Sequence, residues 1–369
     1  MDEKKIILVS VSDLVPGMIV ARDVYTRNNQ MLVPADTKIT ESIIARMTFF
    51  GIMSIRVFAS ELEKNIVDEE EEMYMTQQEK EDFAVFKENY ELTIDHVSEN
   101  LNSLLKTADE INTDELVENV DKLVFQSKSR YEIMNMVHHI RTFDDETYRH
   151  SLNVAMINSV FAGWLGMTEY ERKQLTLCGL MHDVGKLLIS KDILRKPGRL
   201  TEEEYEQIKK HPLLGYEKMK DKNIPESVKR VILLHHERAD GSGYPFGFRL
   251  NEIDPYAAIT AISDVYDAMT SNRVYRHGMS PFDVIEIFEK EGRKQFNPMF
   301  LVPILNNLTN TYLQHYVELS NGMKGKIVLI NKNELSRPMI ATDDNQFVDL
   351  LKQRDIKIVD NIKSESKKG

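Results

Sequence analysis

Histidines and acidic residues recur in this chain at spacings that suit metal binding. Glu146 and His150 are four residues apart, so on a helix their side chains lie on the same face. His182 and Asp183 are adjacent, and on a helix such neighbours diverge by about 100°, which leaves the carboxylate able to bridge two ions. Imidazole and carboxylate groups without thiolates fit iron, manganese, zinc, nickel or cobalt and disfavour a cysteine-rich zinc site. The pattern predicts a transition-metal centre.

Four further residues extend this pattern. His211 stands at a predicted helix junction, and the pair His235-His236 ends an apolar segment and enters a glycine-rich loop. Asp264 lies within an apolar helix predicted over 257–269, where an unpaired carboxylate would be costly. A histidine without an organised acidic partner is more often a hydrogen-bonded core or surface residue. That structural interpretation is given to His96, His138, His139, His277 and His315.

Taken in order, these motifs resemble those of the HD-GYP family, a branch of the HD phosphohydrolases. The sequence contains Glu-x-x-x-His, His-Asp-x-Gly-Lys, a lone His-Pro, His-His-Glu-x-x-Asp-Gly-x-Gly-Tyr-Pro and a later Asp. The resemblance runs from about residue 140 to 315. It implies an all-helical catalytic domain with a two- or three-metal centre, whose ligands would be Glu146, His150, His182, Asp183, His211, His235, His236 and Asp264.

Within this ligand set, the resemblance implies special parts for two residues. Asp183 is expected to bridge the metals, and Glu146 is expected to decide between two ions and three. Asp267 competes with Asp264 for one ligand position, but the family pattern favours Asp264 and leaves Asp267 to orient its neighbours. Iron is the metal that the family suggests first, and manganese is the next.

The resemblance also implies an activity, the hydrolysis of cyclic di-GMP to linear pGpG, with continuation to GMP left open. Two close cations would lower the pKa of a bridging water at Asp183 and bind the phosphate oxygens. Lys186 stands four residues after His182, one helical turn away, and is expected to stabilise the phosphate at the same centre.

Substrate contacts are expected from two segments. Gly243 permits a close approach between a ligand and the backbone, and Tyr244 can stack on a guanine or hydrogen-bond to it. A purely architectural part for this loop stays open. Arg273 and Arg276 stand at the family's phosphate- and base-contacting positions, where a planar guanidinium suits both uses. Val274 replaces a proline that is common in the family and leaves the arginine spacing unchanged.

Two other functions compete with this one. The first is hydrolysis of another cyclic dinucleotide or nucleotide, because the loop does not settle the base. The second is a sensor that binds cyclic di-GMP without cleaving it. The complete ligand set together with Lys186 favours the enzyme.

The residues of the centre belong to a mainly α-helical chain. We predict an α/β module over 1–62, an acidic linker and long helices over 63–139, the catalytic domain over 140–317, a small β module over 318–360 and a frayed tail over 361–369. In the first module, strands are predicted at 19–21, 30–33 and 54–58 and a helix at 40–47. Apolar residues between 83 and 134 recur at steps of three and four, which indicates long helices. Packing of these helices on the main domain and a homodimer formed through them are both open.

Composition narrows the partners. A net charge of −12 argues against binding to a nucleic-acid polymer but leaves room for a small phosphorylated ligand held by local cations. No apolar run reaches the length of a membrane span, so no membrane partner is expected. Cys178 is the only cysteine, which rules out an intrachain disulfide and makes a reducing cytoplasm the expected compartment.

Overall fold

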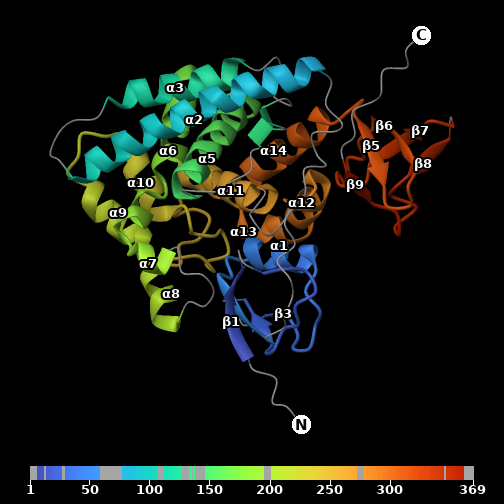
Figure 1. Ribbon diagram of the computed structural model, residues 1–369, viewed down its shortest axis with the longest axis horizontal. Helices are drawn as coiled ribbons and strands as arrows, with labels where there is room; N and C mark the ends of the chain where they lie inside the picture. The colour runs from blue at the N-terminus through green and yellow to red at the C-terminus, as the bar shows by residue number, and fades with distance from the viewer. Residues whose placement is uncertain are drawn as a thin grey trace.

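The computed structural model describes residues 6–11, 14–26, 30–58, 77–106, 112–126, 133–134, 136–137, 146–194, 201–271, 278–344 and 346–360. A small strand-containing module at the N-terminal end lies below a mainly helical body in Figure 1, and an antiparallel sheet at the C-terminal end lies to the right of that body. This arrangement confirms the predicted fold class. None of the described helices is both long enough and apolar enough to cross a membrane.

The N-terminal module combines two strand pairs with one helix. Its strands pair antiparallel as β1 (Ile6–Ser10) with β4 (Ser54–Phe58) and β2 (Val24–Tyr25) with β3 (Met31–Val33). Helix α1 (Glu41–Phe49) begins after Thr40, whose hydroxyl accepts a hydrogen bond from the Ile43 amide. The module has an apolar cluster of its own, while Ala45 and Phe49 of α1 join the main core instead.

One strand predicted in this module is wrong. Ile19 and Val20 form only isolated bridges, to Lys38 and Val57. A turn at residues 16–17 and a bend at 21–22 leave too few extended residues between them for a ladder. The predicted strand at 54–58 is confirmed, and the one at 30–33 is confirmed as β3.

The helical body is built from short and medium helices that follow one another closely. They are α5 (Glu146–Trp164), α6 (Glu169–Met181), the 3-10 helix η3 (Val184–Leu188), α7 (Lys191–Leu194), α8 (Glu202–Ile208), α9 (His211–Met219), α10 (Glu226–Leu234), α11 (Pro255–Thr270), α12 (Pro281–Ile287), the π-helical turn η4 (Phe288–Gly292), α13 (Arg293–Gln295) and α14 (Pro298–Thr311). Thr168 and Thr201 open α6 and α8 with capping boxes, the second of which confirms the sequence prediction.

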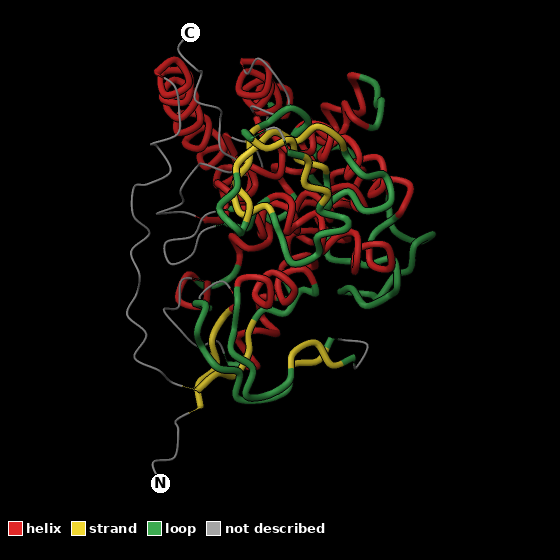
Figure 2. Tube along the Cα trace, turned by 90° about the vertical axis from the view of Figure 1, so that its right-hand side faces the viewer, coloured by secondary structure: helices red, strands yellow, loops and turns green. Residues whose placement is uncertain are grey.

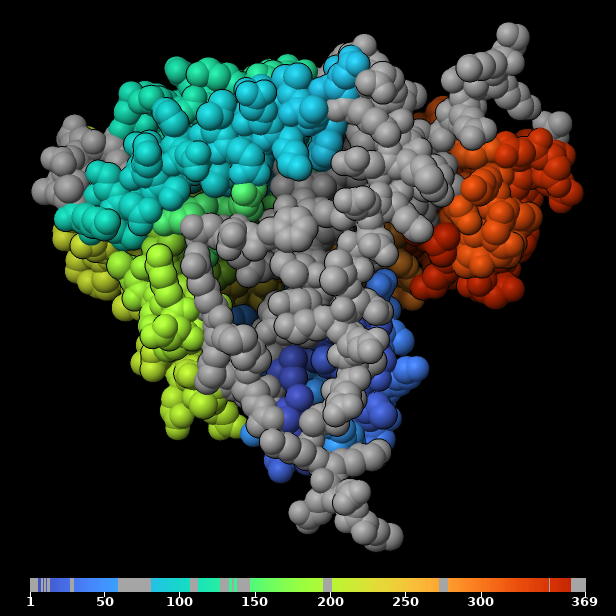
Figure 3. Space-filling model, viewed as in Figure 1, coloured from blue at the N-terminus to red at the C-terminus, as the bar shows by residue number. Residues whose placement is uncertain are grey.

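A long helix, α2 (Gln77–Lys106), and the shorter α3 (Thr113–Gln126) cover this body (Figure 3). Their apolar faces, with Tyr90 and Leu101 of α2 and Val120 of α3, belong to the same buried cluster as α5 and α6. A buried ion pair between Arg172 of α6 and Asp121 of α3 fastens the layers. The interpretation of the long helices as packing on the main domain is confirmed.

The C-terminal sheet is antiparallel, with strand order β8-β7-β6-β5-β9. Its strands are β5 (Tyr316–Leu319), β6 (Lys324–Leu329), β7 (Met339–Thr342), β8 (Phe347–Asp349) and β9 (Ile358–Asp360). Figure 2 shows the sheet in front of the helices, with the N-terminal strands below. Buried Val317, Ile327 and Ile340 join the main core. The sheet is also held by Glu286 of α12, which pairs with Arg337 and Lys357 at 3.5 and 3.1 Å.

Candidate metal centre

The structure gathers seven of the eight predicted ligands into two adjoining groups. Within each group, one ligand atom from every residue lies within 4.8 Å of the others. The first group holds Asp183, His211, His235 and His236, and the second holds His150, His182 and Asp264. Residues up to 114 positions apart in sequence therefore converge, as between His150 and Asp264.

Helix ends position most of these side chains. Helix α6 ends at Met181, so His182 follows it directly and Asp183 precedes η3. The predicted single helix from His182 to Lys186 is therefore wrong. Gly185 permits a close contact with the next helix, because a Cβ there would lie 1.9 Å from the carbonyl oxygen of His211. This close contact presses η3 against the start of α9 and brings Asp183 beside His211.

Backbone carbonyls determine which nitrogen each buried imidazole offers. The Nδ1 atoms of His182 and His211 lie 2.7 and 2.8 Å from the carbonyl oxygens of Gly179 and Ile208. His235 Nδ1 lies 3.0 Å from the carbonyl of Val231. A carbonyl can only accept, so each Nδ1 carries a proton, and a ring in its neutral form then presents the lone pair of Nε2. This is the usual outer arrangement around a metal-binding histidine.

The Nε2 atoms of four rings converge in two pairs. His211 Nε2 lies 3.2 Å from His235 Nε2, and His182 Nε2 lies 3.3 Å from His150 Nε2. In the first pair both Nδ1 protons are already directed at carbonyls, so no hydrogen bond can join the two Nε2 atoms. Two convergent lone pairs in a buried place require a cation between or beside them. The donor set thus fits transition-metal ions.

Asp183 joins the two groups through its two carboxylate oxygens. Its Oδ1 lies 3.2 Å from His211 Nε2 and 3.6 Å from His235 Nε2. Its Oδ2 lies 3.4 Å from His182 Nε2 and 3.7 Å from His150 Nε2. The residue is buried, and Oδ1 has no hydrogen-bond partner within the described ranges. A buried carboxylate oxygen that faces imidazole nitrogens without accepting a hydrogen bond is suited to bind a metal ion. This carboxylate is placed to bridge two ions.

His150 is oriented by a chain of hydrogen bonds that begins on α2. The hydroxyl of Tyr90 donates to Asn153 Oδ1 at 2.8 Å, and Asn153 Nδ2 donates to Asp267 Oδ1 at 3.0 Å. Asp267 Oδ2 lies 2.7 Å from His150 Nδ1, while His150 Nε2 lies 3.0 Å from Asp264 Oδ1. Asp264 therefore lies with His150 in the second group of predicted ligands, and Asp267 contacts the other nitrogen of the same ring.

Burial and charge set the protonation of the centre. Burial lowers the pKa of His235 to about 4 and that of His211 and His236 below the ordinary value, which keeps these rings neutral. Burial also opposes charge on His150, but hydrogen bonds to Asp264 and Asp267 outweigh it and raise the pKa of His150 to about 10. In the metal-free protein His150 is therefore protonated at neutral pH, and a metal ion that binds to this ring must displace the proton.

Lys186 reaches the centre as predicted, although from a 3-10 helix. Its Nζ lies 2.5 Å from Asp183 Oδ2. Burial opposes the charge of Lys186, but the carboxylates of Asp183 and Asp264 outweigh it and raise the pKa of Lys186. Burial raises the pKa of the Asp183 carboxyl, but Lys186 and His182 outweigh burial and hold this pKa well below its usual range. The pair stays charged at neutral pH.

The glycine-rich loop after α10 packs against the residues with which it begins. A Cβ at Gly243 would lie 2.4 Å from the Arg238 amide nitrogen and the Glu237 Cα, so the close approach that this glycine permits is to the protein itself. Glu237 accepts hydrogen bonds from the amides of Phe246 and Phe248 at 2.7 and 2.9 Å. Tyr244 stacks on His236, with ring centroids 4.6 Å apart and planes at 25°. Through Tyr244 the loop thus packs against His236, one of the predicted metal ligands.

Three predicted site residues are not placed by these contacts. Glu146 begins α5, but its side chain lies outside the described residues, as do Arg273 and Arg276 altogether. The third metal site and the two arginine contacts therefore remain predictions.

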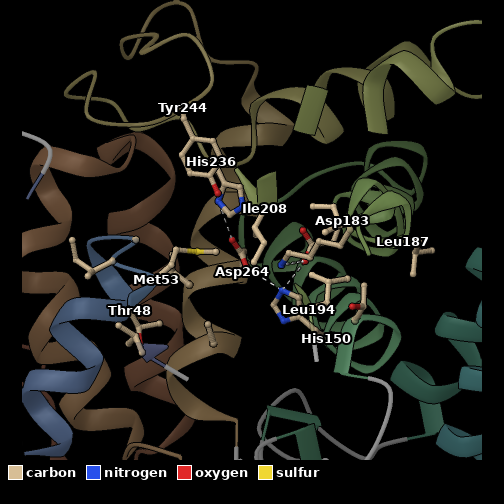
Figure 4. Close-up of a pocket in the computed structure, with 18 of the residues that line it drawn as sticks. Thr48, Met53, His150, Asp183, Leu187, Leu194, Ile208, His236, Tyr244 and Asp264 are labelled. Carbon is tan, nitrogen blue, oxygen red and sulfur yellow. Dashed lines mark hydrogen bonds and ion pairs between the residues drawn. The ribbon is translucent and has the colours of Figure 1, made fainter. Parts of the chain in front are cut away.

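The centre opens into a cavity of about 440 Å³. Its floor includes His150, Asp183, His236 and Asp264. Figure 4 shows Met53 and Thr48 on one side of this space, Asp183, Leu187 and Leu194 on the other, and Tyr244 above His236. Met53 and Thr48 belong to the N-terminal module, so that module forms part of the cavity wall.

Sequence reasoning missed three contributors to this site. Glu237 and Arg238 directly follow His235 and His236 in the sequence, and this adjacency was the signal that could have identified them. The contribution of residues 50–53 had no local signal, because it arises only when the N-terminal module packs against the helical body.

Comparison with known proteins agrees with this geometry. A family model described as HD domain matches residues 115–299, half of the chain, and starts within α3, earlier than the expected boundary near residue 140. The chain is 32% identical over 202 residues to a cyclic di-GMP phosphodiesterase of Pseudomonas aeruginosa, covering 54% of this chain and 49% of the relative. It is 36% identical over 169 residues to a cyclic di-GMP phosphodiesterase of Thermotoga maritima, covering 45% of each.

Two further comparisons concern a relative named for a different cyclic dinucleotide and a solved structure. A 3'3'-cGAMP-specific phosphodiesterase of Vibrio cholerae is 40% identical over 145 residues, covering 39% of this chain and 34% of the relative. The chain spans about half or less of the length of these curated relatives. A solved structure of a Bdellovibrio bacteriovorus HDG"Y"P protein shares the fold, with a TM-score of 0.50, 19% identity and coverage of 82% of this chain and 99% of the other.

Proposed function

Because this chain belongs to the HD-domain family, we propose that it is a metal-dependent phosphodiesterase that hydrolyses cyclic di-GMP to pGpG. One observation carries the proposal above all. The two oxygens of Asp183 face two groups of histidines, and both groups border a cavity that also receives Lys186. This arrangement suits two adjacent cations and a phosphodiester placed above them.

Bound metal ions would supply Lewis acidity to the phosphodiester and a water nucleophile active at neutral pH. The residues would do the rest. Lys186, held beside Asp183 at 2.5 Å, would neutralise charge that develops on the phosphate oxygens. Tyr244 would keep His236 in place by stacking. The enclosing cavity would limit water around the reacting phosphate, which strengthens each of these electrostatic contacts.

The finer points of the proposal rest on the resemblance. We propose iron as the first choice of metal and manganese as the second, with two ions held by the seven gathered ligands and a third if Glu146 joins them. Arg273 and Arg276 would contact phosphate and base, and Gly243 would shape the loop at the substrate. GMP would be a later product if pGpG is also cleaved.

A second substrate is supported by a specific observation. The relative from Vibrio cholerae is named for 3'3'-cGAMP and is 40% identical over its matched segment. Hydrolysis of 3'3'-cGAMP is therefore the alternative, and it would use the same centre with a different base in the cavity.

The decisive experiment measures metal content and products together. Full-length protein is purified without oxygen, its iron and manganese are quantified, and cyclic di-GMP and 3'3'-cGAMP are supplied in parallel. We expect two or three ions per chain and faster cleavage of cyclic di-GMP, detected chromatographically as pGpG. Asp183→Ala should lose metal and activity together, whereas Asp221→Ala, an exposed aspartate on the surface, should lose neither. A fully metallated protein that binds but does not cleave either dinucleotide would be a sensor.

A further inference from the structure

Arg238 is a buried cation on the wall of the metal cavity. The residue is only 7% exposed and lines the same cavity as His236 and Asp264. Its Nη1 donates hydrogen bonds to the carbonyl oxygens of His235 at 3.2 Å and Glu237 at 3.0 Å. A guanidinium has five N–H donors, so much of its capacity is left over.

No carboxylate pairs with Arg238 in the described part of the chain. The acidic groups near it are engaged elsewhere. Glu237 accepts the amides of Phe246 and Phe248, Asp240 accepts the Ser242 amide and hydroxyl, and Asp264 faces His150. A buried charge without a carboxylate partner is costly, so a ligand of opposite sign would stabilise it.

Two aromatic rings link Arg238 to the N-terminal module. Its guanidinium carbon is 5.1 Å from the ring centroid of Phe296. That ring contacts the ring of Phe49, at the end of α1, with centroids 5.5 Å apart. The next residues, 50–53, line the cavity together with Arg238. Met53 points into this space in Figure 4.

We propose that Arg238 forms a second anion subsite of this cavity, closed by the N-terminal module, for the phosphodiester that the metal centre does not hold. A cyclic dinucleotide has two phosphodiesters, and one cluster of metals can act on only one at a time. The planar fork of arginine binds a phosphate in two places. The apolar side chain of Met53 then covers the neighbouring base. The inference rests on the proposed function and assigns it a specificity-determining residue.

The test compares a substrate with two phosphodiesters and one with a single phosphodiester. Cyclic di-GMP and bis(p-nitrophenyl) phosphate are supplied to the metallated full-length protein. Arg238→Gln is expected to raise KM for cyclic di-GMP by roughly 10- to 100-fold, the loss of a charge-assisted hydrogen bond. Hydrolysis of bis(p-nitrophenyl) phosphate and the metal content should stay within about twofold. Arg238→Lys, which keeps the charge but not the fork, should fall between.

Two further variants sharpen the comparison. Arg230→Gln removes the same charge from α10, where Arg230 is half exposed and faces Asp254, and it should change neither substrate. Met53→Ala should raise KM for cyclic di-GMP by roughly threefold to tenfold through lost apolar contact, again without affecting bis(p-nitrophenyl) phosphate. If Arg238→Gln instead loses metal, or weakens both substrates equally, Arg238 merely supports the ligand segment and the subsite is refuted.

A binding measurement separates this inference from the proposed activity. Chelator-treated protein cannot turn the substrate over, and its affinity for cyclic di-GMP is measured by calorimetry, with circular dichroism to verify folding. Wild type should bind, and Arg238→Gln should bind roughly 10-fold or more weakly. Binding by the chelated protein that depends on Arg238, together with no cleavage by the metallated protein, would uphold the subsite and reject the phosphodiesterase. Equal binding by both proteins would reject the subsite alone.

Discussion

The carboxylate of Asp267 lies 2.7 Å from Nδ1 of His150, two residues that are 117 positions apart. This contact decides that Nε2 of His150 faces the metal group. Asp267 is itself held by Asn153 and Ser271 at 3.0 and 2.8 Å, so its position is set before any metal binds. The stability of the metal centre therefore depends on a residue that is not among the proposed ligands.

Replacing this orienting carboxylate should weaken metal binding without removing a ligand. We expect Asp267→Asn to lower metal affinity by roughly 10- to 100-fold, the usual cost of losing such an outer contact. Competition with a chromophoric chelator measures the affinity, and circular dichroism reports the fold. Tyr90→Phe, which removes only the far end of the hydrogen-bond chain, should give a smaller loss. An unchanged affinity in Asp267→Asn would show that the contact is incidental.

Lys186 gives a prediction of the opposite kind. Lys186→Gln removes a positive charge 2.5 Å from Asp183 Oδ2, so cations at the centre should bind at least as tightly as before. The turnover number should nevertheless fall by roughly 100- to 1,000-fold, because the charge that stabilises the phosphate is gone. Metal analysis and steady-state kinetics on one preparation test both halves. Loss of metal in this variant would mean that Lys186 serves assembly of the centre instead.

Metal removal should destabilise the protein measurably. Convergent lone pairs such as those of His211 and His235 are left facing each other when the ions leave, and bound ions stabilise only the folded state. The gain is about 4 kcal/mol when free metal exceeds its dissociation constant 1,000-fold. Differential scanning calorimetry should show a lower Tm in chelator, restored by added Mn²⁺. Asp183→Ala supplies the control, since its Tm should not respond to either addition.

A pH prediction concerns the contact between α12 and the C-terminal sheet. Burial raises the pKa of Glu286, but Lys290 and Lys357 outweigh burial and lower this pKa from its ordinary value of 4.5 to about 2. A lowered pKa in the folded state means that the stabilisation is complete above pH 4.5 and is lost as pH falls toward 2. Because the lysine partners are exposed, we expect about 1–2 kcal/mol at neutral pH after solvent screening.

Glu286→Gln measures this contribution. Its unfolding free energy should lie below that of wild type at pH 7, and the difference should shrink steadily below pH 4.5. Denaturant titrations at several pH values give both curves. Glu217→Gln, at an exposed pair on α9, is the matched control and should follow wild type throughout. A difference that persists at low pH would assign the effect to packing rather than to charge.

The identity of the proposed ligands was readable from the sequence because it depends on residue type and spacing. Histidine beside aspartate, as at His182 and Asp183, and the loop before Tyr244 are local patterns, and the family comparison confirms the resemblance they carry. The capping box at Thr201 and the apolar face of α2 were equally local, since a helix start and a helix face are encoded within a few residues. The mainly helical fold class followed from these signals.

The relations among those ligands depended on the tertiary structure. The close approach of η3 to α9 depends on the contact at Gly185, and the positions of the Nδ1 protons of His182 and His211 depend on carbonyls that the folded chain brings to them. Nothing local in Met53 or Arg238 announces a shared cavity. Residue spacing encodes what a chain can ligate, but distance, burial and charge pairing between remote segments exist only after the core has packed.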